Sequence, residues 1–527
     1  MRRWLPLSLY PLVAAWLTWP VVLDPGGVIP GAERSDAWNS IWSLWFVYEE
    51  LASGRLPLHT DLLQFPIGGR LVVADPLNGL LGFPLVAAFG PVVAYSLLVL
   101  GHLVFSGFAA HAFGRKLGGT GYVAGLGYML APVVLSHVHN GSSEAIAAGW
   151  LPLAGLALLA VVERGGAWRI CLAALAMFTC ALSGWYAGIG AWCLLLGLLV
   201  VHRLPRLALV GVLAVGATLP WARAVREVAR AEDGLVHIKN DDDMARLRRT
   251  LGAADVRTFF VPGPYRSPDF QHLEGRPGDY VHTSYLGFTL ILLALVATWR
   301  RRDTAPWWIA LAIAIVLALG PVVVLDGFPA SFKGRAIPLP YLALEKLPGF
   351  DALSLLYRFS GAAVLALAAM AERALPRRED RWLGLVAGAV VALEFLFVAP
   401  TAGLPELSEV PVSPALEALD DAPAGAVVNL PVTASRAYLY EQVLHGKPLA
   451  ASLNTGANRA ALEVFTAARL SEGPDEVSRT AEEQGVRYVV VHKDLLIAEA
   501  FVRSAGMIRA NFVLLAEDDR VRIYQLY

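Results

Sequence analysis

The chain has 527 residues, of which 56% are hydrophobic and 17% charged, and its mean hydropathy is +0.54. Soluble domains usually carry about 25% charged residues, so this composition indicates a membrane protein. A net charge of −1 leaves no basic excess to neutralise phosphates, which argues against a nucleic-acid-binding protein. The three cysteines (Cys171, Cys180 and Cys193) lie in apolar runs, which predicts buried small side chains rather than disulfides or zinc ligands.

The first segment, 1–23, combines a basic start with an apolar run of about 20 residues, the length of a membrane-spanning helix. A cleaved signal peptide has a shorter apolar core and a small-residue exit, which the sequence WPVVLDP does not offer. We therefore interpret this segment as a retained first span.

The loop that follows, about 24–76, is too polar to cross a bilayer and contains Asp36 directly before an amphipathic run. The aromatic spacing of that run suits a helix lying at a membrane surface. A carboxylate held there could take a proton from an acceptor hydroxyl, or orient a metal or a leaving phosphate, so Asp36 is the first catalytic candidate. The apolar positions of the run are Trp38, Ile41, Trp42, Trp45 and Phe46.

Asp75 closes the same loop at the start of the next apolar segment. An N-cap of the following helix is the simpler interpretation. Two acids at the two ends of one loop could nevertheless converge on one pocket, so Asp75 is the second catalytic candidate. Asp61, in the middle of the loop, is expected to be solvated.

Hydropathy predicts about eleven membrane spans. The segment 77–90 is apolar too, but Pro84 and Gly90 interrupt it, so it could be a re-entrant or interfacial helix or the start of a long second span. The count is therefore open by one or two spans. The predicted spans lie near residues 4–23, 91–113, 121–138, 145–162, 168–183, 185–202, 206–221, 281–298, 306–325, 354–372 and 382–400.

Lysine and arginine alternate between the two sides of these spans. The short turns 136–145 and 183–188 contain neither residue, which the positive-inside bias predicts for outward turns. The N-terminus is then cytoplasmic, whereas the long loops 24–76, 222–280 and 326–353 and everything after about residue 400 lie outside. The turns assigned to the cytoplasm contain Arg2, Arg3, Arg115, Lys116, Arg164, Arg169, Arg203, Arg206, Arg300, Arg301, Arg302, Arg373, Arg377, Arg378 and Arg381.

The outward turn 136–145 holds His137, His139 and Glu144. Two histidines at i and i+2 with an acid beyond could bind a metal, although a hydrogen-bonding role, or none, is the simpler interpretation. All three are candidate substrate-binding residues. For Glu144 the alternative is that it simply caps the next helix.

Arg358 lies about one turn into a predicted span, in the sequence LLYRFS. An arginine at that depth is costly unless it snorkels or binds an anion such as a lipid phosphate, and both interpretations stay open. Arg266 and His282, at the outward side of the eighth span, are weaker candidates of the same kind.

The tail, 401–527, changes character after a proline-rich linker. Strand-like runs at 426–432, 486–492 and 521–527 alternate with helical candidates at 435–445 and about 459–484. This alternation predicts a small soluble α/β domain at 401–527, outside the membrane, following a helical membrane domain at 1–400. No internal repeat of fixed period is present, so a transporter built from two similar halves has no support.

Several sequence segments together resemble the GT-C superfamily, polytopic glycosyltransferases that use polyprenyl-phosphate-linked sugars. The resemblance covers nearly the whole chain. It implies an α-helical polytopic fold in which an acid of the first outward loop is the base or metal-orienting group, a position that Asp36 matches, with Asp75 as a second loop acid. The segments are GAERSDAWNSIWSLWF, LLQFPIGGRL, AADVRTFFVPGPY, YLGF, KLPGFDALSLLYRFSG, VVNLP, LHGKP and GVRYVVVH.

The expected function is that of an inverting glycosyltransferase (hexosyl- or pentosyltransferase) of the bacterial inner (plasma) membrane. It would move a sugar from a polyprenyl-phosphate carrier to a glycan, lipid or protein acceptor on the non-cytoplasmic face. The expected partners are that carrier, the acceptor and membrane lipids, without nucleic acid. Transfer needs no nucleotide, no cofactor is certain from the sequence, and a divalent metal ion stays an option.

Two alternatives remain: a transporter or flippase for a lipid-linked glycan, and a non-catalytic assembly protein with the GT-C scaffold. Transporters usually place ionisable residues deep inside spans, where this sequence offers Glu394.

Overall fold

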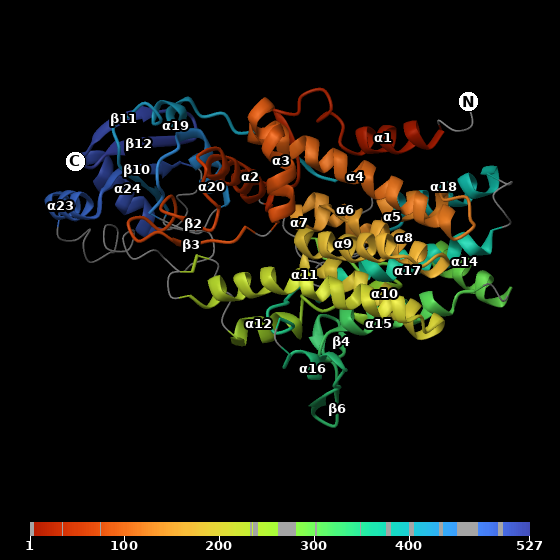
Figure 1. Cartoon of the computed structure of the whole chain (residues 1–527). Coiled ribbons are helices and arrows are strands. Elements are labelled where there is room, and N and C mark those ends of the chain that lie inside the picture. Colours follow the sequence, from red (N-terminus) through yellow and green to blue (C-terminus); the bar gives the residue numbers. More distant parts are fainter. Residues whose placement is uncertain are drawn as a thin grey trace.

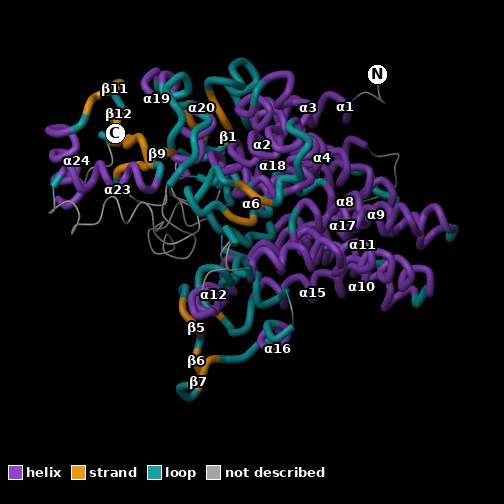
Figure 2. The backbone as a smooth tube through the Cα atoms, turned by 60° about the vertical axis from the view of Figure 1, so that its left-hand side comes forward, coloured by secondary structure: helices purple, strands orange, loops and turns teal. Residues whose placement is uncertain are grey.

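A bundle of long helices makes up most of the computed structural model, and a unit built on a four-stranded sheet lies at one end of it (Figure 1). Figure 2 shows the same division, with the helices gathered on one side and the C-terminal strands on the other. The structure describes residues 5–33, 35–73, 75–231, 234–235, 241–261, 281–300, 303–347, 349–375, 381–399, 405–431, 436–450, 473–493 and 499–527.

The bundle is built from helices of unequal length. Among the described residues, four helical stretches are long and apolar enough to cross a membrane: Pro91–Lys116, Ser143–Glu163, Trp185–His202 and Pro205–Arg230. Five further apolar helices are shorter, so the count of about eleven spans stays a prediction. The helices are α1 (Leu5–Leu17), α4 (Pro91–Lys116), α5 (Tyr122–Met129), α6 (Pro132–His139), α7 (Ser143–Ile146), α8 (Trp150–Glu163), α9 (Ala167–Ser183), α10 (Trp185–His202), α11 (Pro205–Arg230), α14 (Phe288–Trp299), α15 (Ala305–Leu319), α17 (Ser360–Ala374) and α18 (Arg381–Phe397).

Two sequence-based boundaries are wrong, and one of the two alternatives for the segment 77–90 is excluded. The predicted span 121–138 is two helices, because Pro132 has no backbone N–H and holds Ala131 in an extended conformation (φ −54°, ψ 134°). The outward loop predicted to begin at 222 begins after Arg230, since the polar segment beyond the apolar stretch is rich in good helix formers and continues α11. The segment 77–90 is a separate helix, α3 (Pro76–Phe89), which ends at Gly90 and is not the start of α4.

Two acids within the helices, Glu372, which is buried, and Glu394, which is half-buried, cap the starts of other helices. Glu372, missed in the sequence analysis, accepts hydrogen bonds from the backbone N–H groups of Gly121 (3.0 Å) and Ala124 (2.9 Å) at the start of α5. Glu394 accepts from the Tyr285 hydroxyl (2.6 Å) and from backbone N–H groups at the start of α14. Both carboxylates therefore satisfy helix N-termini that would otherwise lack acceptors.

The C-terminal sheet has the strand order β11-β12-β10-β9, in which β9 and β10 are parallel and the other pairs antiparallel. Strands β9 (Ala426–Leu430), β10 (Val486–His492) and β12 (Val521–Gln525) lie where the sequence predicts them, whereas β11 (Val513–Glu517) is an addition. The associated helices are α19 (Pro414–Ala418), α20 (Arg436–His445), α23 (Pro474–Gln484) and α24 (Glu499–Asn511). Part of the predicted helix 459–484 and the predicted domain boundary near residue 400 lie outside the described residues.

The loop between α1 and α3 packs against this sheet unit. Its helix α2 (Ala37–Ala52) lies beside α20 (Figure 1). The Trp42 indole N–H donates to Gln442 Oε1 (2.7 Å), and the Trp38 ring lies 5.0 Å from that of Tyr440. Strand β1 (Val28–Pro30) pairs with β8 (Leu407–Glu409). The aromatic face of α2 is therefore covered by protein, and the predicted placement of this face at a membrane surface is wrong.

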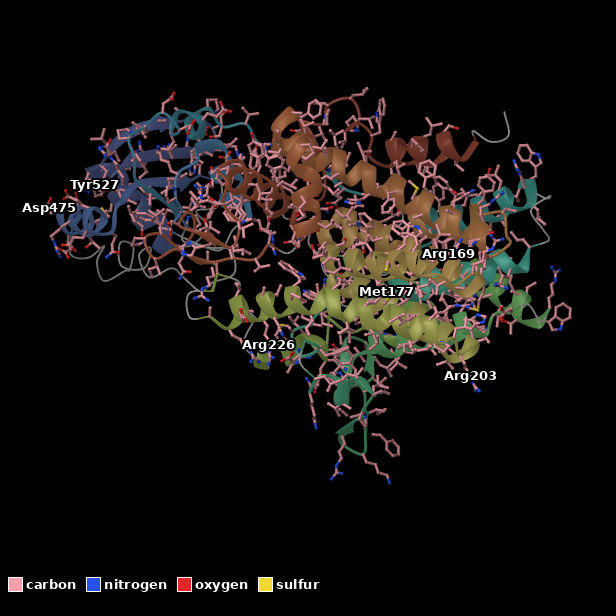
Figure 3. All side chains as sticks on the ribbon, viewed as in Figure 1. Arg169, Met177, Arg203, Arg226, Asp475 and Tyr527 are labelled. Atoms are coloured by element: carbon pink, nitrogen blue, oxygen red, sulfur yellow. The ribbon has the colours of Figure 1, made fainter. Side chains whose placement is uncertain are left out.

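The helix bundle has two distinct ends. In Figure 3, Arg203 lies at the end of the bundle remote from the C-terminal unit, whereas Arg226 lies toward that unit, beyond which Asp475 and Tyr527 are found. An orientation with Arg203 in the cytoplasm and the C-terminal unit outside is compatible with this arrangement, and the sidedness itself stays a prediction.

Two short hairpins project from the bundle below α15 (Figures 1 and 2). They are formed by β4 (Val324–Leu325), β5 (Phe328–Pro329), β6 (Ser331–Phe332) and β7 (Arg335–Ala336), and the nearby short elements are α12 (Asp241–Arg248), α16 (Tyr341–Leu344), η1 (Val256–Phe259) and η4 (Leu356–Phe359). A third hairpin, β2 (His59–Thr60) with β3 (Gly69–Arg70), lies in the first outward loop.

Candidate functional site

A cavity of about 280 Å³ lies between α2, α3, α4, α7 and the start of α20. Three acids reach it from three separate segments: Asp36, Asp75 and Glu144. Its other walls combine polar side chains with an apolar surface of similar extent. The lining residues are Asp36, Asn39, Ser40, Ser43, Leu44, Asp75, Asn78, Gly79, Tyr95, Leu98, Val99, His102, Ser143, Glu144, Ile146 and Arg436.

Asp36 occupies the N-cap position of α2, but its side chain makes no capping hydrogen bond. The carboxylate instead forms an ion pair with the Arg436 guanidinium at the start of α20. The Asp36 backbone N–H donates to Asn140 O (2.9 Å), which fixes the start of α2 against the turn after α6. Gly141 makes this close approach possible, because its φ is +63° and a Cβ there would lie 2.3 Å from the Ala37 nitrogen.

Asp75 is both a helix cap and part of the cavity wall. Its Oδ1 accepts a hydrogen bond from the Asn78 backbone N–H (3.0 Å), which confirms the predicted N-cap of α3. The residue is only 6% exposed, and its Oδ2 has no hydrogen-bond partner among the described residues. Burial raises the pKa of Asp75 well above its ordinary value; the Asn78 N–H opposes this shift, and the charge of Glu144 adds to it.

Glu144 separates this cavity from a smaller one of about 50 Å³. Its Oε1 accepts a hydrogen bond from Arg358 Nη1 (2.8 Å), and the guanidinium lies 5.4 Å from the ring of Tyr186. The Arg358 side chain is 6% exposed, so it is enclosed by protein and does not extend into solvent. A buried arginine keeps its charge where a carboxylate partners it, as Glu144 does here.

The histidine candidates are placed differently. His137 lines the smaller cavity together with Glu144 and Arg358. His139 is buried at the end of α6, where its carbonyl accepts from the Ala32 backbone N–H (2.8 Å), and it does not line either cavity. His282 stacks on Tyr357 with ring centroids 4.6 Å apart, next to Arg358.

Arg266 lies outside the described residues. Within the part of the chain that the structure describes, no group of three or more His, Cys, Asp or Glu side chains is arranged to hold a metal ion.

Several polar residues that line the cavity were not predicted from the sequence, among them Asn39, Ser43, Asn78 and His102, and neither was Arg436. His102 of α4 contacts Asn78 of α3, with 2.6 Å between Nε2 and Oδ1. A histidine within a 26-residue apolar helix was a usable signal, because polar groups in such helices usually have a function. Asn39 and Ser43 lie four residues apart on α2 and therefore share a face. Arg436 gave no signal, because it meets Asp36 across 400 positions of sequence.

Comparison with protein-family models finds no match, and comparison with curated proteins finds none either. Solved structures do match. The arabinofuranosyltransferase AftD from mycobacteria superposes with a TM-score of 0.56 at 16% identity, over 100% of this chain and 40% of that one. The chain thus spans about two fifths of that enzyme's length.

A second match is the oligosaccharyltransferase of Archaeoglobus fulgidus in complex with Zn and sulfate. Its TM-score is 0.52 at 15% identity, over 92% of this chain and 68% of the other. The apo form of that enzyme gives a TM-score of 0.51 at 12% identity. At these identities the likeness concerns the fold. The chain therefore has the fold of these solved transferases, in agreement with the fold that the sequence resemblance implied.

Proposed function

We propose that the protein is a membrane glycosyltransferase that moves a sugar from a polyprenyl-phosphate carrier to an envelope or lipid-linked acceptor on the non-cytoplasmic face. The observation that carries the proposal is the convergence of Asp36, Asp75 and Glu144 on one cavity of a GT-C fold, next to two arginines. The three acids come from three segments that the positive-inside bias places on the same side.

Asp36 is the proposed general base. As the acceptor oxygen attacks the anomeric carbon, Asp36 takes the proton of that hydroxyl, and the bond between the anomeric carbon and the carrier phosphate oxygen breaks. The phosphate leaves with the electron pair and needs little acid assistance. A single displacement of this kind inverts the anomeric configuration. Asp36 suits the role because its side chain is 25% exposed and can be reached by an acceptor, whereas Asp75 is enclosed.

Arg358 is the proposed contact for the carrier phosphate. Its guanidinium lies directly behind Glu144, so a phosphate entering from the bundle side would share or replace that carboxylate as its partner. Guanidinium groups bind phosphate with two parallel hydrogen bonds, a geometry that a lysine cannot offer.

The proposed steps are written for the protein's own side chains, without a divalent metal ion. The three carboxylates are oxygen donors of the kind that hard cations prefer. In this arrangement, however, Asp36 and Glu144 are each engaged by an arginine, and no metal-ligand cluster is present among the described residues.

The alternative of a transporter gains no support from the two acids inside helices. Glu372 and Glu394 are both engaged in helix caps, where they stabilise the bundle and leave no free carboxylate for a transport path. The alternative of a non-catalytic scaffold is separated from the enzyme by experiment.

That experiment measures sugar transfer by the purified full chain in lipid nanodiscs, supplied with synthetic polyprenyl-phosphate sugars and an envelope extract as acceptor. Mass spectrometry of envelope glycans and lipid-linked sugars in a deletion strain selects the donor and acceptor. Asp36→Asn should lower the transfer rate by about 10²–10⁴-fold, the usual contribution of a general base. Asp61→Asn is the matched control, because Asp61 belongs to the same loop and its side chain is 80% exposed. Unchanged transfer by Asp36→Asn would remove Asp36 from the mechanism, and no transfer by the wild type with any donor would favour a scaffold.

A further inference from the structure

We infer that the cavity recognises one uncharged sugar ring as the group to be transferred, an inference that rests on the proposed function. The residues that would contact the ring are Asn39 and Ser43 of α2, Asn78 of α3 and His102 of α4. The inference concerns the class of donor and the residues that select it.

The first support is unused hydrogen-bonding capacity on α2. Asn39 and Ser43 line the cavity, and the structure records no hydrogen bond of their side chains to any described residue. An amide and a hydroxyl can each donate and accept, as sugar hydroxyls do. Polar groups that line an enclosed site need partners from water or from a ligand of this kind.

The second support is the fixed orientation of the opposite wall. Asn78 donates through Nδ2 to Ser143 O (3.3 Å), so its Oδ1 is the atom that faces His102 Nε2 and accepts from it. In the neutral imidazole that this assignment gives, Nε2 carries the proton and Nδ1 is an acceptor. No partner of Nδ1 is found in the described part of the chain. His102 can thus accept a hydrogen bond from a sugar hydroxyl.

The third support is Asp75 Oδ2, a polar atom without a hydrogen-bond partner on a residue that is more than nine-tenths buried and lines the cavity. A buried oxygen of this kind is costly unless a ligand or water donates to it. On the other side, Leu98, Val99 and Ile146 offer an apolar surface for the C–H face of a ring.

The size and charge of the cavity restrict the class of ligand that it can hold. A volume of about 280 Å³ is near the lower end of the roughly 300–1,000 Å³ found for small-molecule pockets, so the cavity can enclose one ring but not an oligosaccharide. The walls carry three carboxylates, of which Asp36 and Glu144 are paired with arginines and Asp75 is not. Both guanidinium groups beside the cavity, those of Arg436 and Arg358, are therefore already engaged, and the carboxylate of a uronic acid would be enclosed without a cation of its own, which disfavours acidic sugars.

The test is a binding measurement without acceptor, so that it does not depend on transfer. The full-length protein in nanodiscs is titrated with a short polyprenyl phosphate, bare or carrying a neutral hexose, a neutral pentose or a uronic acid. We expect a neutral sugar to bind more tightly than the bare carrier, and the uronic acid to bind no better than the bare carrier.

In the double variant Asn39→Ala/Ser43→Ala, the affinity for the neutral-sugar carrier relative to the bare carrier should fall about five- to thirtyfold, which corresponds to the loss of one to two hydrogen bonds. The affinity for the bare carrier itself should not fall. Asn511→Ala is the matched control, because Asn511 lies in α24 of the C-terminal unit. His102→Gln provides an independent variant, which should also reduce the preference.

The possible failures can be told apart. Equal binding of bare and sugar-linked carriers, or tighter binding of the uronic acid, would overturn this inference and leave carrier binding intact. An unchanged preference in the double variant would overturn the assignment of the residues. No binding of any polyprenyl compound by the wild type would overturn the proposed function and this inference with it.

Discussion

Replacing Trp42 by alanine should loosen the C-terminal unit from the first outward loop. The Trp42 side chain is 2% exposed, stacks on Phe46 with ring centroids 5.1 Å apart, and donates its indole N–H to Gln442. Replacing a buried tryptophan by alanine lowers the free energy of unfolding by about 3–5 kcal/mol. The loss of the indole donor for Gln442 Oε1 contributes part of this figure. Because Arg436 lies on the same helix as Gln442 and lines the cavity, the variant should also disturb the cavity wall beside Asp36 and slow transfer.

The measurement is pulse proteolysis of the full chain in nanodiscs, with cleavage of the C-terminal unit as the readout, followed by the transfer assay. Trp168→Ala is the matched control, since Trp168 lies on α9 and is 76% exposed. A membrane-surface helix would give a different outcome, because Trp42 would then contact lipid and its loss would leave the C-terminal unit as resistant as in the control. Equal protease resistance of the two variants would refute the packing described here.

The remaining predictions concern the two other acids of the cavity. Glu144→Gln should destabilise the protein by about 3–5 kcal/mol, because it leaves the Arg358 charge buried without a carboxylate. Thermal unfolding should therefore show a lower Tm. A variant as stable as the wild type would contradict the pairing of Glu144 with Arg358. Asp75→Asn should flatten the pH dependence of stability. The raised pKa of Asp75 means that the folded state holds its proton more tightly than the unfolded chain, so this group stabilises below about pH 4 and loses that contribution as pH rises toward the folded pKa. Asparagine keeps the N-cap and does not titrate. If the Tm of Asp75→Asn fell with rising pH as steeply as the Tm of the wild type, the pKa of Asp75 would not be raised in the folded state.

The sequence indicated which segments share the site better than it indicated which side chains pair there. The absence of lysine and arginine from 136–145 groups Glu144 with the first outward loop, and the structure brings Glu144 to Asp36 and Asp75. Arg436 could not be predicted in this way, because nothing in a local window indicates which distant side chain will pair with Asp36.

The aromatic stripe of α2 shows a second reason for failure. Amphipathic spacing indicates that one face of a helix is kept from water, but lipid and a protein core both provide such an environment. Trp42 and Phe46 are covered by α20 and the sheet, which no feature of their spacing distinguishes from a bilayer. Hydropathy has a similar weakness at α11, where it marks the end of the apolar stretch and not the end of the helix. The runs AVVNL and VRYVVVH were identifiable because short β-branched runs are typical of buried strands.

The burial of the charged groups in the cavity divides their tasks in the proposed reaction. Asp36 and Arg436 are 25% and 34% exposed, and pairs of this kind are worth only about 0–1 kcal/mol, so an acceptor hydroxyl can replace Arg436 at small cost. Arg358 is enclosed by protein, so the separation of its charge from Glu144 is expensive unless another anion takes that place. A carrier phosphate satisfies this condition and a neutral acceptor does not. We therefore assign proton transfer to Asp36, whose ion pair with Arg436 can open. Phosphate binding is assigned to Arg358, whose buried guanidinium must always have an anion beside it.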